Sequence, residues 1–130
     1  MGKAGIKRLT KNDHSWLKPS SKSHQAGMNL PLGQFSEMFP EIVGADGSPR
    51  IELIVSWYDS EGTRIGVTDN EVVWYNSKRE LRLLKIRKET FSELARTGSL
   101  IAIHRKNEKL QIRAIPKSLE PILSMFQTLP

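Results

Sequence analysis

Short runs of alternating apolar and polar residues constrain the fold of this chain more than any other feature. In the clearest run, residues 51–58 (IELIVSWY), every second residue from Ile51 to Trp57 is apolar, which is typical of a strand with one buried face. Similar runs are expected at residues 5–10, 28–30, 63–67, 71–76, 81–87, 100–105 and 109–115. We interpret residues 68–70 (TDN) as a turn between two of them. Short strands separated by turn signals predict a mainly β domain, a closed or nearly closed barrel of about seven strands.

Two or three short helices are expected to plug the ends of this barrel. Phe35, Met38 and Phe39 have helical spacing. Thr90 and Glu93 have the spacing of a capping box, so a second helix is expected to begin at Thr90. A third is expected near the end of the chain. Because the chain has 130 residues and no linker-like tract, we expect a single domain over residues 1–130. It has no cysteine, which excludes disulfides and thiolate metal sites.

Positive charge is concentrated in two segments far apart in the sequence. The net charge is +6, and residues 1–26 hold six basic residues against one acid, whereas residues 78–89 hold six against two. These segments sum to +5 and +4, which leaves −3 for the rest of the chain. Two basic segments on an otherwise mildly acidic chain suggest two arms that bind one polyanion. The alternative is a pair of solvated charged faces.

Sequence motifs of catalysis are absent. The chain has no GxGxxG, GxxxxGK or HExxH motif, and no acidic residue is followed two positions later by lysine. The histidines, His14, His24 and His104, are not at metal-ligand spacings. No segment approaches the roughly 20 apolar residues of a membrane span. We therefore expect no catalytic site, cofactor or metal in this domain and no membrane partner.

The polar segment before residue 28 carries side chains that suit nucleic acid. Lysine and serine suit phosphate oxygens, whereas His24 and Gln25 suit base edges. Trp16 either stacks on the nucleic acid or holds the loop against the body of the domain. The residues expected here to contact the DNA backbone are His14, Lys18, Ser21, Lys22 and Ser23.

The second basic segment contains the most discriminating residue of the chain, Glu80. Arg79 and Arg82 can each donate two hydrogen bonds to guanine O6 and N7. An acid among bases repels phosphate, so Glu80 either accepts a hydrogen bond from cytosine N4 or forms an ion pair that positions a neighbouring arginine. Both interpretations are open at this point. The residues expected here to contact the DNA backbone are Ser77, Lys78 and Lys85.

Several sequence blocks, taken in order, resemble the N-terminal effector-binding domain of EcoRII-like Type II restriction endonucleases. IKRLTKND is followed by a polar loop ending HQAGMNLP and by an apolar helix ending FP. Further on, VVWYNSKRELRLLKI holds a Tyr-Asn-Ser turn and then an Arg-rich run with an embedded Glu-x-Arg. The blocks span residues 6 to about 88, and the last third of the chain is similar only in its strand pattern.

The resemblance implies a DNA-binding pseudobarrel, the fold of plant hormone-response transcription factors, whose two arms enter the major groove. Residues 14–29 would form the N-arm and residues 76–88 the C-arm. His24, Glu80 and Arg82 fall on DNA-contacting positions of the family, which reads a short CCWGG site. The resemblance further implies a cytoplasmic prokaryotic enzyme whose cleavage domain would follow this one and would alone need Mg²⁺. The chain departs from the family at Asn29, where an aromatic residue is expected.

We therefore expect a monomeric domain that recognises a double-stranded DNA sequence in the major groove, without enzymatic activity of its own. The residues expected to read bases are His24, Gln25, Asn29, Arg79, Glu80 and Arg82. One alternative is a single-stranded nucleic acid or RNA binding module, which needs exposed aromatic residues on a sheet face. The candidates are Trp57, Tyr58, Trp74 and Tyr75, and one of each adjacent pair should be buried. The other alternative is a basic protein-interaction domain.

Overall fold

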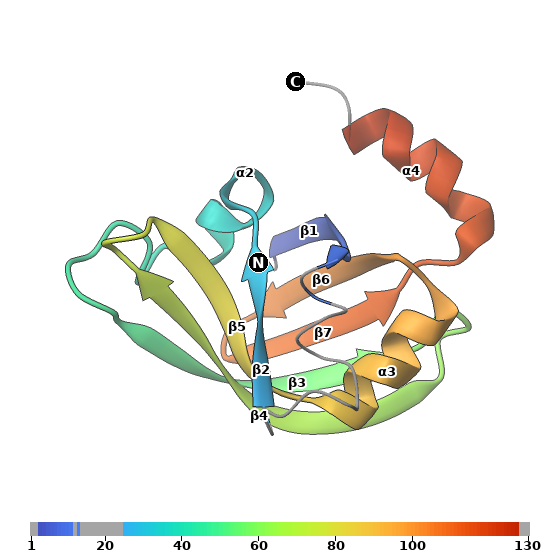
Figure 1. Cartoon of the computed structure of the whole chain (residues 1–130), viewed down its shortest axis with the longest axis horizontal. Helices are drawn as coiled ribbons and strands as arrows, with labels where there is room; N and C mark the ends of the chain where they lie inside the picture. Colours follow the sequence, from blue (N-terminus) through green and yellow to red (C-terminus); the bar gives the residue numbers. More distant parts are fainter. Residues whose placement is uncertain (1–2, 12, 14–24, 128–130) are drawn as a thin grey trace.

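The computed structural model describes residues 3–11, 13 and 25–127. Within these residues a seven-stranded mixed sheet curls into a half-barrel accompanied by three short α-helices (Figure 1). The elements are β1 (Lys3–Arg8), β2 (Gln25–Leu30), α2 (Leu32–Phe35), the 3-10 turn η1 (Ser36–Met38), β3 (Arg50–Tyr58), β4 (Arg64–Tyr75), β5 (Glu80–Arg87), α3 (Lys88–Thr97), β6 (Leu100–Lys106), β7 (Lys109–Ala114), η2 (Lys117–Leu119) and α4 (Glu120–Gln127). The prediction of a mainly β, seven-stranded barrel-like fold with two or three short helices is confirmed, and the sheet is a half-barrel where a closed or nearly closed barrel was expected.

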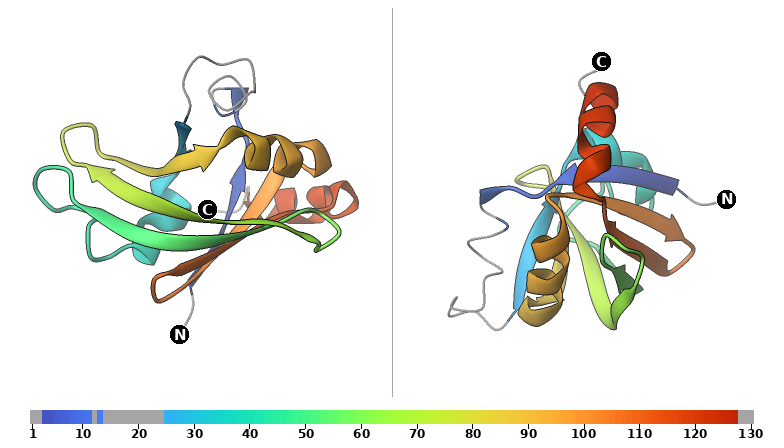
Figure 2. Two further views of the ribbon diagram at one scale, coloured as in Figure 1. Left: turned by 90° about the horizontal axis from the view of Figure 1, so that it is seen from below. Right: turned by 90° about the vertical axis from the view of Figure 1, so that its right-hand side faces the viewer.

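The order of the strands makes β1 and β2 the two edges of the sheet. The order is β1-β6-β7-β3-β4-β5-β2, and all neighbours are antiparallel except β3 and β7. The curl of the sheet is visible from two further directions in Figure 2. The helix α2 follows β2 directly and packs against β1, so it links the two edges. Gly5 permits this approach, because a Cβ at that position would lie 2.7 Å from Cε1 of Phe35.

The core lies on the inner face of the half-barrel. Trp57 and Trp74 are fully buried there, together with Phe35 and Phe39 from the segment after β2. The alternation predicted for residues 51–58 is confirmed in β3, where the even positions are more exposed than Leu53, Val55 and Trp57. The same pattern holds in β5, where Leu81 and Leu83 are buried. The apolar periodicity of the sequence therefore identifies the inner face.

The predicted turn at residues 68–70 is wrong, because β4 is one continuous strand of 12 residues. Thr68 and Asn70 are buried and bond within the core. Trp57 Nε1 donates to Thr68 Oγ1 at 2.7 Å, Thr68 Oγ1 donates to Asn70 Oδ1 at 2.5 Å, and Asn70 Nδ2 donates to the carbonyl of Leu84 at 2.9 Å. Polar residues typical of a turn here satisfy each other inside the barrel.

The capping box predicted at Thr90 is also wrong. α3 begins at Lys88, Thr90 lies within its first turn, and no side-chain hydrogen bond caps the helix. Gly98, which follows the helix, is extended with φ −173°. It is needed for close packing, since a Cβ at this position would lie 2.7 Å from the carbonyl oxygen of Ile115. The ends of the strands also differ from expectation: β1 ends at residue 8, and β2 begins at residue 25.

One basic residue of the first charged segment, Lys7, forms a buried ion pair and is not part of the charged surface. Lys7 is buried, and its Nζ lies 3.1 Å from Oδ2 of the buried Asp13. The same carboxylate accepts a hydrogen bond from the backbone of Thr10 at 2.8 Å. Lys7 and Asp13 therefore neutralise each other, and the net positive charge of the segment rests on its other basic residues.

The last helix, α4, stands away from the sheet at the edge of the molecule (Figures 1 and 2). Its Ile122 and Met125 are exposed, as is Leu119 just before it. Among the helices that the structure describes, none has the length and apolar character needed to cross a membrane.

Candidate nucleic-acid interface

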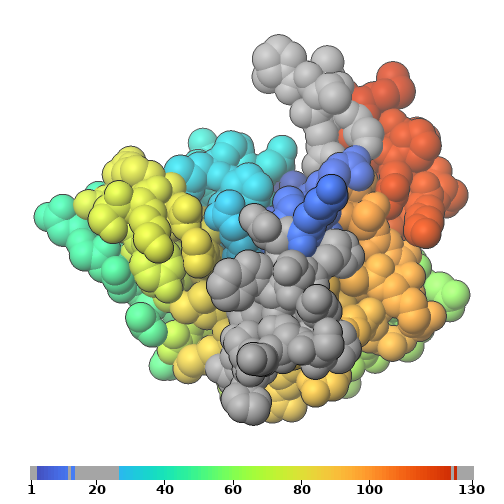
Figure 3. All heavy atoms as spheres, viewed as in Figure 1, coloured from blue at the N-terminus to red at the C-terminus, as the bar shows by residue number. Residues whose placement is uncertain are grey.

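The pairing of β2 with β5 brings two distant segments of the sequence side by side. The register runs from Gln25 opposite Arg87 to Leu30 opposite Leu81. Asn29 lies opposite Arg82, so their backbones are about 4.8 Å apart across the ladder. Figure 3 shows β5 in yellow beside β2 in blue on one face of the molecule. β2, which contains the last residues of the expected N-arm, therefore lies along the expected C-arm.

Part of the expected N-arm lies outside the described residues. These positions are His14, Lys18, Ser21, Lys22, Ser23 and His24. Gln25 is described as the first residue of β2, and the side chain of Asn29 is exposed. The roles assigned to these residues stay predictions.

The expected C-arm, residues 76–88, consists of the turn between β4 and β5, all of β5 and the first residue of α3. Its tip is residues 76–79, where the amide of Lys78 donates to the carbonyl of Tyr75 at 3.2 Å and the amide of Arg79 donates to that of Asn76 at 3.3 Å. Arg79 closes the turn with φ +54°, in the left-handed region. Ser77, Lys78 and Arg79 are all exposed. The tip therefore presents two cations and a hydroxyl to solvent.

The turn at residues 44–49 braces this hairpin. The Nε1 of Trp74 donates to the carbonyl of Ala45 at 3.1 Å and to Oδ1 of Asn76 at 3.2 Å. The amide of Asn76 donates to the carbonyl of Gly47 at 3.1 Å. Because Trp74 is fully buried in the core, these bonds fix the hairpin to the body of the domain. A surface held in place in this way loses little conformational freedom on binding a ligand.

Arg79 packs back onto the hairpin. Its guanidinium carbon lies 4.9 Å from the centroid of the Trp74 ring, and its Nη1 donates to Oδ1 of Asn76 at 3.1 Å. The stacking adds to the bracing of the tip. Contact between Arg79 and a guanine stays a prediction.

Glu80 and Arg82 form an ion pair on the outer face of β5. Oε2 of Glu80 accepts from Nη2 of Arg82 at 2.7 Å and from its Nε at 3.0 Å. The guanidinium carbon also lies 5.6 Å from the centroid of the Tyr75 ring. Of the two interpretations open for Glu80, the ion pair with a neighbouring arginine is the arrangement present here. Within the described part of the chain, Nη1 of Arg82 and Oε1 of Glu80 have no hydrogen-bond partner.

A second ionic cluster on the outer face was not foreseen from the sequence. Glu71 on β4 accepts from Nη1 of Arg50 on β3 at 2.9 Å and pairs with Nζ of Lys85 on β5 at 3.0 Å. Hydrogen bonding from Lys85, with a smaller contribution from Arg50, holds the pKa of Glu71 below its ordinary value. Arg50 and Glu71 were missed because only the strand register brings these three side chains together.

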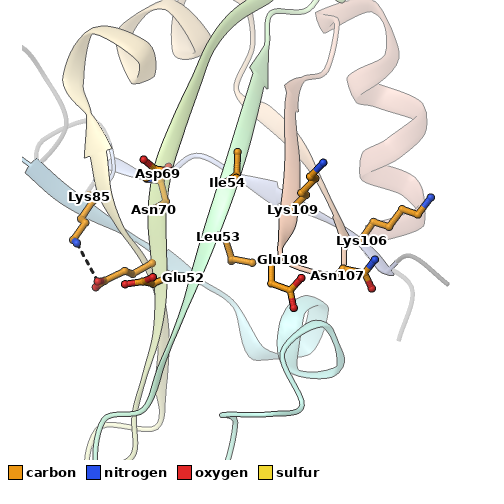
Figure 4. A pocket seen from close by; sticks show the side chains of 11 residues that line it. Glu52, Leu53, Ile54, Asp69, Asn70, Lys85, Lys106, Asn107, Glu108 and Lys109 are labelled. Atoms are coloured by element: carbon orange, nitrogen blue, oxygen red, sulfur yellow. Dashed lines mark ion pairs between the residues drawn. The ribbon is translucent and has the colours of Figure 1, made fainter.

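A groove of about 940 Å³ adjoins this cluster over the outer face of β3. Figure 4 shows Lys85 on one side, Lys106 and Lys109 on the other, and Ile54 between them. The lining contains acids as well as bases, and Lys85 is the one expected site residue in it. The groove is thus largely separate from the expected interface. Over the part of the chain that the structure describes, no group of three or more acidic or histidine side chains is arranged to hold a metal ion.

The aromatic pairs are split between the two faces, as the alternation predicts. Trp57 and Trp74 are fully buried, whereas Tyr58 and Tyr75 are partly buried. Tyr75 is also the ring over which Arg82 lies. These four positions do not form an open stacking surface.

Comparison of the chain with models of protein families, with curated proteins and with solved structures finds no match.

Proposed function

We propose that this domain binds double-stranded DNA in a sequence-specific manner, as the recognition or effector module of a Type II restriction endonuclease. The observation that carries the proposal is the antiparallel pairing of β2 and β5, which makes one surface out of two segments that are distant in sequence. β2 follows the basic segment 1–26 directly, and β5 lies within the basic segment 78–89. The blocks that resemble EcoRII-like enzymes fall on the same two segments, which supports this choice of partner.

The Glu80–Arg82 pair leaves unengaged the polar groups that would read a C·G base pair. Glu80 occupies the Nε and Nη2 side of the guanidinium, so the Nη1 and Nη2 end is left to donate to guanine O6 and N7. The remaining oxygen of Glu80 is left to accept from cytosine N4. The ion pair and the contact with cytosine are therefore compatible, and each residue holds the other in position for a base.

In this proposal the binding affinity comes from cations around the Glu80–Arg82 pair, which we call the reading pair. Lys78 at the tip and Lys85 on β5 are exposed and would contact phosphate oxygens. Lys18 and Lys22 would add contacts from the N-arm. Cleavage would belong to a different domain of the parent enzyme, and we assign no catalytic role to the residues named here.

The partial burial of the outer tyrosines favours double-stranded over single-stranded nucleic acid. Single-strand binding depends on bases that stack on open aromatic rings, and Arg82 already lies over Tyr75. A protein-interaction module explains the basic charge equally well, but it gives no reason for a Glu–Arg pair that leaves one acceptor and one donor edge open.

Selection of bound duplexes from a random pool, followed by sequencing, tests the proposed function. We expect a short C·G-rich site of the CCWGG type. Arg82→Ala should weaken binding to the selected duplex by about 1–3 kcal/mol and leave binding to random duplexes unchanged, because a base contact is lost. Arg64→Ala is the matched control, since Arg64 is exposed at the far end of β4. Failure to enrich any sequence, or equal loss on selected and random duplexes, contradicts the proposal.

A further inference from the structure

The cluster of Arg50, Glu71 and Lys85 is built to hold two cations at a fixed spacing on the outer face. One oxygen of Glu71 pairs with Arg50 and the other with Lys85, at 2.9 and 3.0 Å. The glutamate side chain is only 9% exposed, whereas those of Arg50 and Lys85 are 52% and 48% exposed. A buried anion therefore anchors two cations whose side chains are about half exposed. The cluster keeps a net charge of +1.

Lys85 reaches this carboxylate through an unusual backbone conformation. If β5 alternated regularly beyond Leu81 and Leu83, Lys85 would point into the core. Instead Lys85 has φ +64°, and Ile86 takes the buried position. The register with β2 shifts at the same place, so the strand carries a bulge. A lysine held in the left-handed region is a strained arrangement, and such strain often accompanies a binding function.

The inner core supports the bulge. The carbonyl of Leu84, directly before Lys85, accepts the hydrogen bond from Asn70 Nδ2 at 2.9 Å. This bond ends the buried relay that begins at Trp57. The position of Lys85 is therefore fixed from inside the barrel as well as by Glu71.

The cluster is continuous with the proposed reading pair. Arg50 lies opposite Val73, Val73 lies opposite Arg82, and Arg82 lies opposite Asn29. Two strand spacings separate Arg50 from Arg82, which is about 10 Å between backbones. In its ion pair with Glu71, Arg50 donates from Nη1, and Lys85 needs one of its three N–H donors. Both side chains therefore have further donors that could bind another anion.

We propose that Arg50 and Lys85, positioned by Glu71, bind phosphate groups of the same DNA duplex that Arg82 reads. This inference rests on the proposed function and adds to it a backbone-binding site that reaches β3. Arginine and lysine are the side chains that neutralise phosphates, and each such contact contributes to the salt dependence of binding. Glu71 is a positioning residue and touches no DNA.

Salt titrations of duplex binding test this site. We compare the wild type with Arg50→Gln and Lys85→Gln, and use Arg64→Gln as the matched control for an exposed arginine on the same sheet. Each of the first two variants should reduce the log–log salt slope by about 0.9, with equal loss of affinity on selected and random duplexes. Arg64→Gln should leave the slope unchanged. Melting curves establish that all variants are folded.

Glu71→Gln separates positioning from simple charge. This substitution raises the net charge by one, so long-range electrostatics alone would tighten binding. If Glu71 positions the two cations, the salt slope falls instead. An unchanged slope in Arg50→Gln, or a loss confined to the selected duplex, overturns the phosphate site while the proposed function stands. Tighter binding by Glu71→Gln overturns the positioning role. Absence of duplex binding by the wild type overturns the proposed function itself.

Discussion

Glu71 is the residue on which two cations from neighbouring strands converge. Its burial would ordinarily favour the neutral acid, but the hydrogen bond from Lys85 and the charge of Arg50 outweigh that effect. The pKa of Glu71 is therefore lower in the folded chain than in the unfolded chain. A carboxylate with a lowered pKa stabilises the fold above its unfolded pKa, and this stabilisation disappears as the pH falls through the folded pKa.

The lowered pKa of Glu71 determines how the stability of the fold depends on pH. We expect Glu71→Gln to lower the free energy of unfolding by roughly 1–3 kcal/mol at pH 6, because a hydrogen-bonded charge is lost. The difference should shrink as the pH falls below about 4.3, where the unfolded carboxylate is protonated. Urea unfolding at several pH values between 3 and 6 measures it. Glu37→Gln, an exposed glutamate in η1 away from this cluster, is the control and should change stability little. A difference that is the same at every pH contradicts the assignment.

For individual residues, the sequence indicates which side chains are charged and which face of a strand they occupy, but not which residues they contact. The outward position of Arg82 followed from the alternation of β5, and the structure agrees. The stacking of Arg79 on Trp74 did not follow, because it depends on the turn that puts Arg79 at φ +54°. Lys7 is one of the basic residues counted in the first charged segment, and it is buried against Asp13. The charge pattern of a sequence shows where charged residues occur along the chain, whereas their ion-pair and stacking partners depend on tertiary contacts.

Among the elements, β5 carries the Glu80–Arg82 pair and Lys85, and its bulge determines which way Lys85 points. The extra residue lies between Leu83 and Ile86, opposite Ala26 and Met28 of β2. Left-handed backbone is costly for residues with a Cβ and easy for glycine.

A glycine–alanine comparison tests the bulge. We expect Lys85→Gly to be more stable than Lys85→Ala by about 1 kcal/mol, because glycine adopts φ +64° without strain. The same pair of substitutions at Arg87, where φ is −74°, should favour alanine instead. The measurement is the free energy of unfolding in urea for all four variants. The same order at both positions would show that the backbone at Lys85 is unstrained in solution.

The errors of element prediction also have physical causes. The turn expected at residues 68–70 does not form. Thr68 accepts a hydrogen bond from the buried Trp57, and this bond favours an extended backbone at these polar residues. The helix expected at Thr90 begins at Lys88, where it directly continues β5. Local patterns located the strands that alternate strongly, such as β3. They failed where buried polar groups pair across strands, because the sequence does not show such pairing.

For the whole molecule, the curl of the sheet determines which segments meet. β1 and β2 follow one another in the sequence but occupy opposite edges, and β2 instead joins β5. This topology puts residues 25–30 beside residues 81–87, whereas the sequence gives no indication of their proximity except through the family resemblance. The proposed DNA-binding surface is consequently a property of the fold and not of either basic segment alone.

Backbone amide shifts on titration with the selected duplex test whether both segments bind one DNA molecule. We expect the amides of residues 25–29 and those of residues 78–87 to shift together with a single Kd, while the amides of α4 remain unchanged. Shifts confined to one of the two segments, different Kd values for the two, or shifts centred on α4 would contradict binding by a common surface.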